Sequence, residues 1–265
     1  MESLANSLKG SRLSRSINTF QNRERWLYTC EHCGSEVEPI ESGGYYARGQ
    51  CQCQGAVSAR NQELEDREKQ RRQYQLAEYK RGQERAGLVK ALALQTFETF
   101  DRSVQPEAYD IALSFFDEPR SMVFAGRTNG LGKTHLSAAI ANRCVEQGKS
   151  VRFGTLAEYL AQIKATYNQE PKMTTDAFLE QLTHSYLLCI DDLGKERLTE
   201  WGREQLFLIV NARYNLRPEG LMVLTSNAEG QELAASMGIH NWSRMQEIAT
   251  VVYMKGTDYR MRRKR

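Results

Sequence analysis

The pattern of hydrophobic and polar positions changes three times along the first third of the chain. Residues 1–29 are polar with scattered apolar positions, and we expect them to become ordered only when bound to something. Residues 30–53 are rich in Gly, Ser and Cys without helical periodicity, which predicts a small unit of loops and hairpins. Residues 56–90 are rich in Gln, Glu, Arg and Lys and lack sustained apolar heptads. This last pattern favours a long solvated helix over a coiled coil.

Alternating strand and helix signals begin after Phe97 and Phe100 and continue to the end of the chain. The continuous apolar runs at 186–191 (YLLCID) and 221–226 (LMVLTS) predict central strands that are covered on both faces. Further strands are predicted at 121–126 and 150–154, and helices at 134–147, 156–166 and 200–214. This order predicts an α/β fold with three layers, in which a parallel sheet lies between helices and ligands bind at the carboxyl ends of the strands.

A glycine-rich segment lies between the predicted strand at 121–126 and the helix that follows it. It ends in Gly132, Lys133 and Thr134, the order that a phosphate-binding loop has before a helix. Glycine lets successive backbone amides point at phosphate, and the helix amino terminus adds a partial positive charge. Lys133 is then placed to reach the β- and γ-phosphates, and Thr134 to offer a hydroxyl to Mg²⁺. The predicted nucleotide contacts are Gly126, Asn129, Gly130, Leu131, Gly132, Lys133, Thr134 and His135.

The spacing of this loop is unusual by one residue. The first glycine of the usual pattern would fall at position 127, which is Arg127, whereas Gly126 comes one residue earlier. A glycine-rich turn that binds no ligand therefore stays open as the alternative.

Two neighbouring carboxylates end one of the predicted central strands. Asp191 is predicted to hold Mg²⁺ through water, and Asp192 to polarise the attacking water. In isolation the pair would equally suit a helix-capping turn. Asn227 follows the strand at 221–226 and is predicted to orient the water near the γ-phosphate, with a turn-forming asparagine as the alternative. Combined with the glycine-rich loop, these residues predict ATP hydrolysis.

Three segments now resemble a known family. NGLGKTHLSAAIAN, LLCIDDLGKERLTEW and LMVLTSN are close to the phosphate loop, Walker B and sensor I segments of the bacterial DnaC/DnaI-type helicase loaders, AAA+ ATPases whose relative is the transposition helper IstB. The resemblance covers roughly 97–260 and implies a P-loop NTPase (AAA+/RecA-like) fold without a full lid domain. It implies that Arg244, in SRM, reaches the γ-phosphate held by a neighbouring subunit, and that Arg260, in DYR, contacts the nucleotide of its own subunit. Plain surface charges are the alternative for both arginines.

Four of the six cysteines lie close together in the sequence. Cys30 and Cys33 form a C-x2-C pair, and Cys51 and Cys53 form a C-x-C pair after a spacer of 17 residues. Four thiolates suit one tetrahedral Zn²⁺, whose binding would contribute folding energy that so short a segment cannot obtain from a core. Four free thiols are the alternative, and His32 is predicted to be a bystander. Such a module resembles what many helicase loaders carry ahead of the ATPase, and IstB-like proteins generally lack it.

Charge and composition add little to this picture. The net charge of +3 is too small to establish a nucleic-acid partner, although Arg260, Arg262, Arg263, Lys264 and Arg265 form a basic cluster that suits phosphate as well as a solvated chain end. No apolar run approaches the roughly 20 residues of a membrane span, and residues 1–15 lack the apolar stretch of a secretory signal. A cytoplasmic protein with no membrane partner is therefore expected.

Sequence and resemblance together predict a partner-binding and zinc-binding module at 1–55, a charged helical linker at 56–94 and an AAA+ ATPase domain at 95–265. The expected function is loading of the hexameric replicative DNA helicase by a homo-oligomer that hydrolyses ATP and contacts single-stranded DNA, with ATP, Mg²⁺ and Zn²⁺ as cofactors. Two alternatives stay open. One is an IstB-like, ATP-dependent regulator of transposition or target choice, and the other is a zinc-stabilised adaptor that binds nucleotide without turnover.

Overall fold

The computed structural model describes residues 22–167, 173–194 and 198–259. The chain divides into two compact units, residues 1–75 and residues 76–265. The division lies inside the segment expected as a linker, because the last turns of helix α3 (Gln54–Ala86) pack into the second unit. The expectation of order on binding for the first 29 residues falls mostly outside the described part of the chain.

The first unit contains two short antiparallel hairpins and the beginning of helix α3. Its elements are η1 (Glu24–Trp26), β1 (Tyr28–Thr29), β2 (Glu36–Val37), β3 (Ile40–Ser42), β4 (Tyr45–Ala47) and α3 (Gln54–Ala86). Gly43 and Gly44 join β3 to β4 with φ of +57° and +79°, as a two-residue type I′ turn requires. The buried apolar residues of this unit are Cys30, Val37 and Ala56. So small a core cannot hold a fold by itself.

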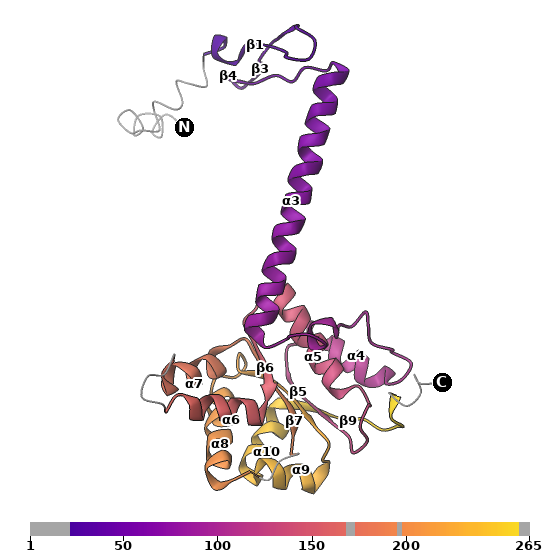
Figure 1. The fold of residues 1–265 in the computed structure, drawn as a ribbon, viewed down its shortest axis with the longest axis vertical. Coiled ribbons are helices and arrows are strands. Elements are labelled where there is room, and N and C mark those ends of the chain that lie inside the picture. The colour runs from indigo at the N-terminus through magenta and orange to yellow at the C-terminus, as the bar shows by residue number, and fades with distance from the viewer. Residues whose placement is uncertain (1–21, 168–172, 195–197, 260–265) are drawn as a thin grey trace. The chain divides into compact units, whose positions relative to one another are not determined.

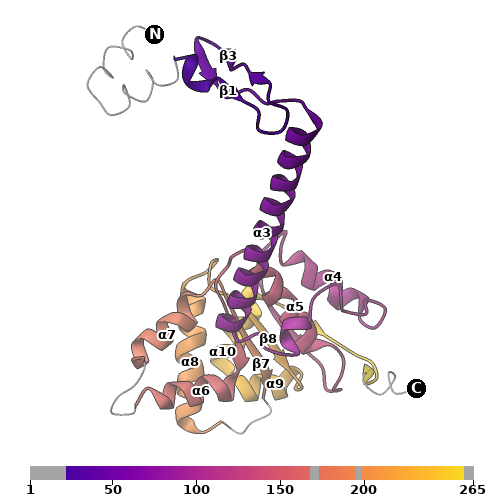
Figure 2. The same cartoon turned by 45° about the horizontal axis from the view of Figure 1, so that its top comes forward.

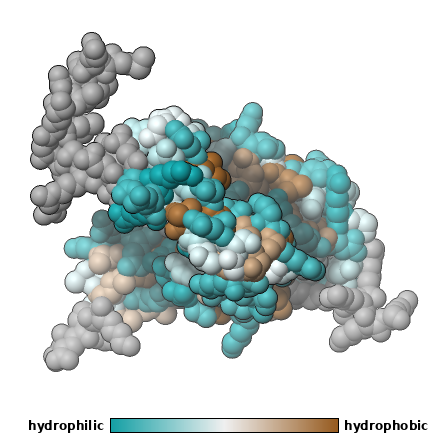
Figure 3. Space-filling view, turned by 90° about the horizontal axis from the view of Figure 1, so that it is seen from above, coloured by the Kyte–Doolittle hydropathy of each residue, from teal (hydrophilic) through white to brown (hydrophobic). Residues whose placement is uncertain are grey.

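Helix α3 is charged and polar on all sides over most of its length, as its composition predicts. Exposed ion pairs join Arg67 to Glu63 and Arg72 to Glu68 one turn apart, and each stabilises the helix by about 0.3–0.5 kcal/mol. Hydrophilic residues also predominate on the face drawn in Figure 3, where hydrophobic residues form small separate patches. The helix ends at Gly87, whose φ of +85° places the next amide, that of Leu88, 2.9 Å from the Gln83 carbonyl. This is a Schellman motif, and it ends α3 four residues before the predicted end.

The second unit is a five-stranded parallel sheet with helices on both faces (Figure 1). The strand order is β6–β7–β8–β5–β9. The strands are β5 (Ser121–Ala125), β6 (Val151–Thr155), β7 (Leu187–Leu193), β8 (Leu221–Ser226) and β9 (Ala249–Tyr253). The helices after α3 are η2 (Leu92–Leu94), α4 (Pro106–Ser114), α5 (Lys133–Glu146), α6 (Leu156–Ala165), α7 (Thr175–His184), α8 (Glu200–Asn215), α9 (Gly230–Met237) and α10 (Ile239–Ile248). The predicted α/β fold class is confirmed.

Two hydrophobic cores lie on the two faces of this sheet. Because successive side chains of a strand point to opposite faces, Met122 and Phe124 of β5 join the core under α4 and α5, whereas Val123 and Ala125 join the core under α6, α8 and α10. All five residues of β5 and all six of β8 are buried, which explains why these strands are continuous apolar runs. Figure 2 shows α5 on the side of the sheet where α3 ends.

A buried arginine fastens the end of α7 to α8. The guanidinium of Arg213 donates hydrogen bonds to the carbonyls of Leu182, Thr183 and Ser185 at 3.0, 2.8 and 2.7 Å. These are carbonyls that the end of a helix leaves without partners. Burial lowers the pKa of Arg213 to about 10, so the group stays charged at neutral pH.

Strand β9 extends the sheet beyond β5 as an edge strand, and the sequence patterns did not single it out. Its residues Ala249–Tyr253 pair in parallel with Ser121–Ala125. The chain therefore returns to the sheet after α10. Within the described ranges, no helix combines the length and the apolarity that a bilayer crossing requires.

Candidate nucleotide-binding site

A cleft of about 800 Å³ opens where β5, β7 and β8 reach their carboxyl ends. The glycine-rich loop that follows β5 forms its floor, through residues 129–134. Asp192 and Asn227 line it from the ends of the two neighbouring strands, and Thr99, Phe100 and His135 form a wall. The structure thus brings the predicted loop, one carboxylate and the polar strand end to one place.

The loop has the geometry of an anion-binding turn. Gly130 and Gly132 have φ of +69° and +92°, and Gly132 directly precedes the first residue of α5. Lys133, only 6% exposed, donates hydrogen bonds from Nζ to the carbonyls of Gly126 and Thr128 at 2.7 and 2.9 Å. The loop backbone therefore wraps around the ammonium group of Lys133. The additional residue is accommodated between Gly126 and Gly130 without displacing Lys133 from α5.

Asp191 lies beside the hydroxyl groups of two threonines. Its carboxylate accepts hydrogen bonds from Thr134 Oγ1 at 3.0 and 3.1 Å and from Thr225 Oγ1 at 2.6 Å. Burial raises the pKa of the Asp191 carboxyl, the two hydroxyls partly offset this, and the neighbouring charge of Asp192 raises it further. A buried carboxylate of this kind is stabilised by a cation. Thr134 and Asp191 are therefore suited to hold Mg²⁺ together, as predicted for that ion.

Asp192 has a backbone conformation that is uncommon outside glycine. Its φ is +57°, and Gly194, two residues later, has φ of +89°. The Asp192 amide donates to Thr225 Oγ1 at 2.9 Å, and its carboxylate accepts from Asn227 Nδ2 at 2.9 Å. Aspartate tolerates the left-handed region better than most residues. These bonds hold the bend that separates the two carboxylates, so that Asp191 faces Thr134 while Asp192 faces the cleft.

One wall of the cleft is aromatic. The rings of Phe100 and His135 meet edge to face at 5.1 Å between centroids. His135 Nε2 lies 2.9 Å from the Thr96 carbonyl and 3.2 Å from Thr99 Oγ1. Burial lowers the pKa of His135, which favours its neutral form, and the bond to the Thr96 carbonyl only partly offsets this. A largely apolar, aromatic wall of this type suits a nucleobase beside a phosphate loop.

The carboxy-terminal segment closes the other side of the loop. Tyr259 donates its backbone amide to the Gly130 carbonyl at 3.2 Å and its hydroxyl to Asp101 Oδ2 at 3.1 Å. A β-carbon on Gly130 would lie 1.7 Å from Asp258 Oδ1, so only glycine fits there. Arg260, predicted to contact nucleotide, lies outside the described residues and follows Tyr259 directly in the sequence. Arg262 and Arg263 lie outside them as well.

Arg244 is the predicted site residue that the structure places away from this cleft. It lies on α10, with its guanidinium 5.1 and 5.6 Å from the ring centroids of Phe207 and Tyr214 of α8. It is not among the residues that line the cleft. A residue that completes the site of a neighbouring subunit must lie on an outer face of its own subunit. This position therefore suits both the predicted role in a neighbour and the plain reading as a stacked surface charge.

The four cysteines of the first unit converge. The Sγ atoms of Cys30, Cys33, Cys51 and Cys53 all lie within 4.8 Å of one another. Cys30 and Cys53 are 3.8 Å apart at sulfur, and Cys33 and Cys51 are 3.5 Å apart. Four sulfurs at about 2.3 Å from one tetrahedral Zn²⁺ would lie about 3.8 Å apart. The residues thus fit zinc, and His32 is not part of this cluster.

The thiols of the two units differ in their electrostatics. Hydrogen bonds from the side chain and backbone of Ser35 lower the pKa of the exposed Cys33 thiol to about 6. Burial instead raises the pKa of Cys144, in the core of the sheet, to about 12. A thiolate binds metal, whereas a buried thiol is inert. The shifts within the cluster are not uniform, because the Cys53 amide lowers the pKa of Cys51 while hydrogen bonds from Cys30 and Cys33 raise it to about 12; burial in the core is what sets Cys144 apart.

Among the site residues that the sequence patterns did not assign a role are Thr225, Phe100 and Tyr259. Thr225 is hidden inside an apolar strand, Phe100 belongs to the segment before the first predicted strand, and Tyr259 lies near the chain end. Only Thr225 had a signal, because a polar residue near the end of a buried parallel strand points toward a ligand site.

Two solved structures share this fold. The crystal structure of the DnaC helicase loader superposes with a TM-score of 0.54 at 23% identity, covering 63% of this chain and 100% of that chain. The crystal structure of DnaI gives a TM-score of 0.52 at 21% identity and covers 62% of this chain and 93% of that one.

Relatives of two kinds match the sequence. The chain is 28% identical over 182 residues to an ATP-binding protein of insertion sequence IS5376 from Geobacillus stearothermophilus, covering 64% of this chain and 70% of the relative. It is 30% identical over 137 residues to the replicative helicase loader DnaC of Buchnera aphidicola subsp. Baizongia pistaciae, covering 52% of this chain and 54% of the loader. The chain thus spans about half the length of that loader. The family described as IstB-like ATP binding protein matches residues 55–265, and the chain therefore belongs to this family.

Proposed function

We propose that the protein is an ATPase that loads a replicative DNA helicase. The observation that carries the ATPase part is that Lys133, Thr134, Asp192 and Asn227 line one cleft, and that Asp191 accepts a hydrogen bond from the Thr134 hydroxyl at 3.0 Å. These residues come from three separate segments of the sequence, and a phosphate loop, a magnesium ligand and a water-orienting pair are the parts that ATP hydrolysis needs.

Each of these groups has a distinct role. The loop amides and Lys133 bind the β- and γ-phosphates, and the ammonium group exchanges its bonds to loop carbonyls for bonds to phosphate oxygens. Thr134 and Asp191 hold Mg²⁺, which when bound offsets the phosphate charge. Asp192 accepts a proton from the attacking water, and Asn227 fixes the orientation of the Asp192 carboxylate.

Phosphate release tests the catalytic role of the second carboxylate. Asp192→Asn keeps a side chain of the same size that can still contact Asn227, but removes the negative charge. We expect it to bind ATP as the parent does and to release phosphate at least about 100-fold more slowly, as removal of general base catalysis does. A variant that turns over like the parent would remove Asp192 from catalysis. A parent that binds ATP without releasing phosphate would favour the adaptor without turnover.

We further propose that turnover requires a homo-oligomer in which Arg244 completes the site of the neighbouring subunit. Arg244→Ala is expected to bind ATP normally and to be inactive alone. Mixing it with inactive Asp192→Asn subunits creates sites with an intact Asp192 and an Arg244 from the neighbour. Recovered turnover in the mixture supports the shared site, whereas a mixture as inactive as its components contradicts it.

The helicase and the single-stranded DNA are proposed partners. The match to DnaC loaders supports the helicase, and the basic positions Arg262 and Arg263 support contact with DNA phosphate. Such contacts weaken steeply with salt: for single-stranded DNA, the logarithm of the binding constant falls by about 0.7 per phosphate contact for each tenfold rise in salt concentration. Binding to oligo-dT that is unaffected by salt, or by Arg262→Ala with Arg263→Ala, would refute the DNA assignment. Helicase loading would place the protein in the cytoplasm.

A regulator of transposition is the second candidate, and the insertion-sequence relative supports it. Against it, the family match begins at residue 55, directly after the four cysteines. The zinc-binding module is therefore additional to the part shared with that family, and we propose that it docks on the helicase. Pull-down of a hexameric replicative helicase by the full chain, lost with Cys33→Ser, supports the loader. Retention of a transposase instead of the helicase supports the regulator.

A further inference from the structure

A fully hydrogen-bonded amide lies behind the nucleotide cleft. Asn142 is on α5, two and a half turns after Lys133, and is 1% exposed. Its Nδ2 donates to the carbonyls of Leu92 and Gln95, both at 2.9 Å. Its Oδ1 accepts from Gln83 Nε2 at 2.6 Å and from Tyr79 Oη at 3.4 Å. Both amide hydrogens and both carbonyl lone pairs are thus used, which is the most that an asparagine can make.

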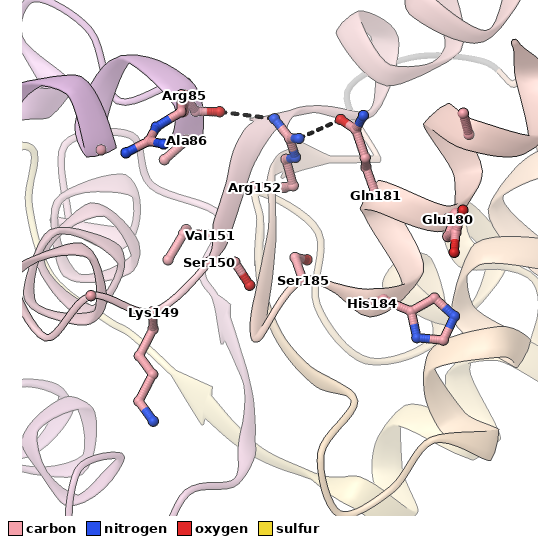
Figure 4. A pocket seen from close by; sticks show the side chains of 13 residues that line it. Arg85, Ala86, Lys149, Ser150, Val151, Arg152, Glu180, Gln181, His184 and Ser185 are labelled. Atoms are coloured by element: carbon pink, nitrogen blue, oxygen red, sulfur yellow. Dashed lines mark hydrogen bonds between the residues drawn. The ribbon is translucent and has the colours of Figure 1, made fainter. Parts of the chain in front are cut away.

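Two of these four bonds come from the last turns of α3, which are held tightly against the ATPase core. A β-carbon on Gly82 would lie 2.6 Å from Val145 Cγ1, so α3 approaches α5 as closely as glycine permits. Arg152 of β6 donates to the Arg85 carbonyl at 2.9 Å and to Gln181 of α7 (Figure 4). The end of α3 is therefore held by α5 on one side and by β6 and α7 on the other.

The other two bonds go to the segment that forms the aromatic wall of the cleft. Gln95, Thr99 and Phe100 all line the cleft, and this segment has one short 3-10 turn and no longer helix or strand. Gln83 also donates to the Ala93 carbonyl at 3.0 Å. Hydrogen bonds to Asn142 and Gln83 thus help to hold the wall relative to the phosphate loop, together with the buried Phe97 side chain and the His135 contact with the Thr96 carbonyl.

We propose that Asn142 is a positioning residue for nucleotide binding, which fixes the wall at residues 95–100 to α5 and joins both to the last turns of α3. The inference rests on the proposed function, because it takes the cleft as the ATP site. Coupling between two sites is reciprocal. A force or partner that shifts α3 against α5 therefore weakens ATP binding, and ATP binding stabilises the last turns of α3. Since α3 follows the four cysteines directly, this links the nucleotide to the helix that carries the partner-binding module.

The test separates binding from chemistry with two variants and a matched control. Asn142→Leu removes all four bonds at similar size, and Gln83→Met removes the two bonds that Gln83 donates, to Asn142 and to the Ala93 carbonyl, at similar length. We expect each to raise the KM for ATP, by about fivefold for Asn142→Leu and about threefold for Gln83→Met. The value of kcat should stay within about twofold, because Lys133 and the carboxylates are untouched. Gln73→Met, on the exposed part of α3, should leave both constants unchanged.

Hydrogen exchange measures the coupling independently. Adding ATP to the parent should slow exchange at the backbone amides of residues 79–86, and this protection should be lost in Gln83→Met. Should Asn142→Leu fail to fold, Gln83→Met and Tyr79→Phe carry the test. An unchanged KM with unchanged protection in Gln83→Met overturns the inference, as does a fall in kcat that parallels a fall in melting temperature. A parent that binds no ATP refutes the proposed function itself, which is a separate outcome.

Discussion

Replacing Thr225 by valine should disturb Asp191 and Asp192, the two carboxylates proposed for magnesium binding and catalysis, without changing either residue. The Thr225 hydroxyl donates to Asp191 at 2.6 Å and accepts from the Asp192 amide at 2.9 Å, and the residue is 1% exposed. Valine has the same shape but offers neither bond. A hydrogen bond to a carboxylate contributes about 1.5–3 kcal/mol and a neutral one about 0.5–1.5 kcal/mol. We therefore expect Thr225→Val to lower the free energy of unfolding by about 2–4 kcal/mol.

The effect is measurable as melting temperature and as turnover. For a domain of this size each kcal/mol corresponds to about 2–4 °C, so the melting temperature should fall by roughly 5–15 °C. The left-handed bend at Asp192 loses its anchor as well, and kcat should fall by at least about tenfold. Thr225→Ser keeps the hydroxyl and should retain most of both quantities. A valine variant with the stability and turnover of the parent would refute the view that this hydroxyl holds the two carboxylates.

Three further predictions follow from charge, metal and backbone geometry. In the folded protein, burial raises the pKa of the Asp191 carboxyl above its ordinary value of 3.8. The folded state then holds this proton more tightly than the unfolded state, so the contribution of Asp191 to the stability of nucleotide-free protein falls as the pH rises above about 4. Denaturant unfolding should show that Asp191→Asn gains stability relative to the parent from about pH 4 upward, and a stability difference that does not change with pH would contradict this. Native mass spectrometry should detect one zinc bound to the parent and none bound to Cys33→Ser, while the melting temperature of the ATPase unit stays the same. Zinc retained by Cys33→Ser would exclude the four-cysteine site. Gly130→Ala should lose ATP binding, because the new β-carbon would collide with Asp258. The control is Gly148→Ala, which has a similar φ of +74° but no atom within 4 Å of its β-carbon, and it should bind ATP as the parent does. Equal loss of binding in both variants would mean that backbone strain alone is responsible.

The sequence predicted the parts of the site that depend on local chemistry. The glycine-rich loop before α5 and the carboxylate pair at the end of β7 could be located because their spacing and their apolar strands are contiguous in sequence. The hydrogen bond between Thr225 and Asp191 could not be predicted in this way, because the two residues lie on different strands and meet only through the register of β7 beside β8. The same holds for Phe100 and Tyr259, which reach the cleft only through the packing of segments far apart in the chain.

The limits of the fold prediction have similar causes. The polar composition of α3 indicated a linker, but Tyr79 and Gln83 are polar residues whose partners lie on α5, so composition hid the docked end of the helix. Strand β9 has β-branched residues at Thr250, Val251 and Val252. This short edge strand follows α10 directly in the sequence. The hydrophobic periodicity of so few residues does not distinguish a strand from the end of a helix.

Calorimetric titration of ATP into the full chain, with Mg²⁺ present, tests the central claim most directly. The account predicts one ATP bound per chain, with heat that disappears in Lys133→Ala although that variant remains folded. A well-folded parent that takes up no ATP, or a Lys133→Ala variant that binds it as tightly as the parent, would contradict the account.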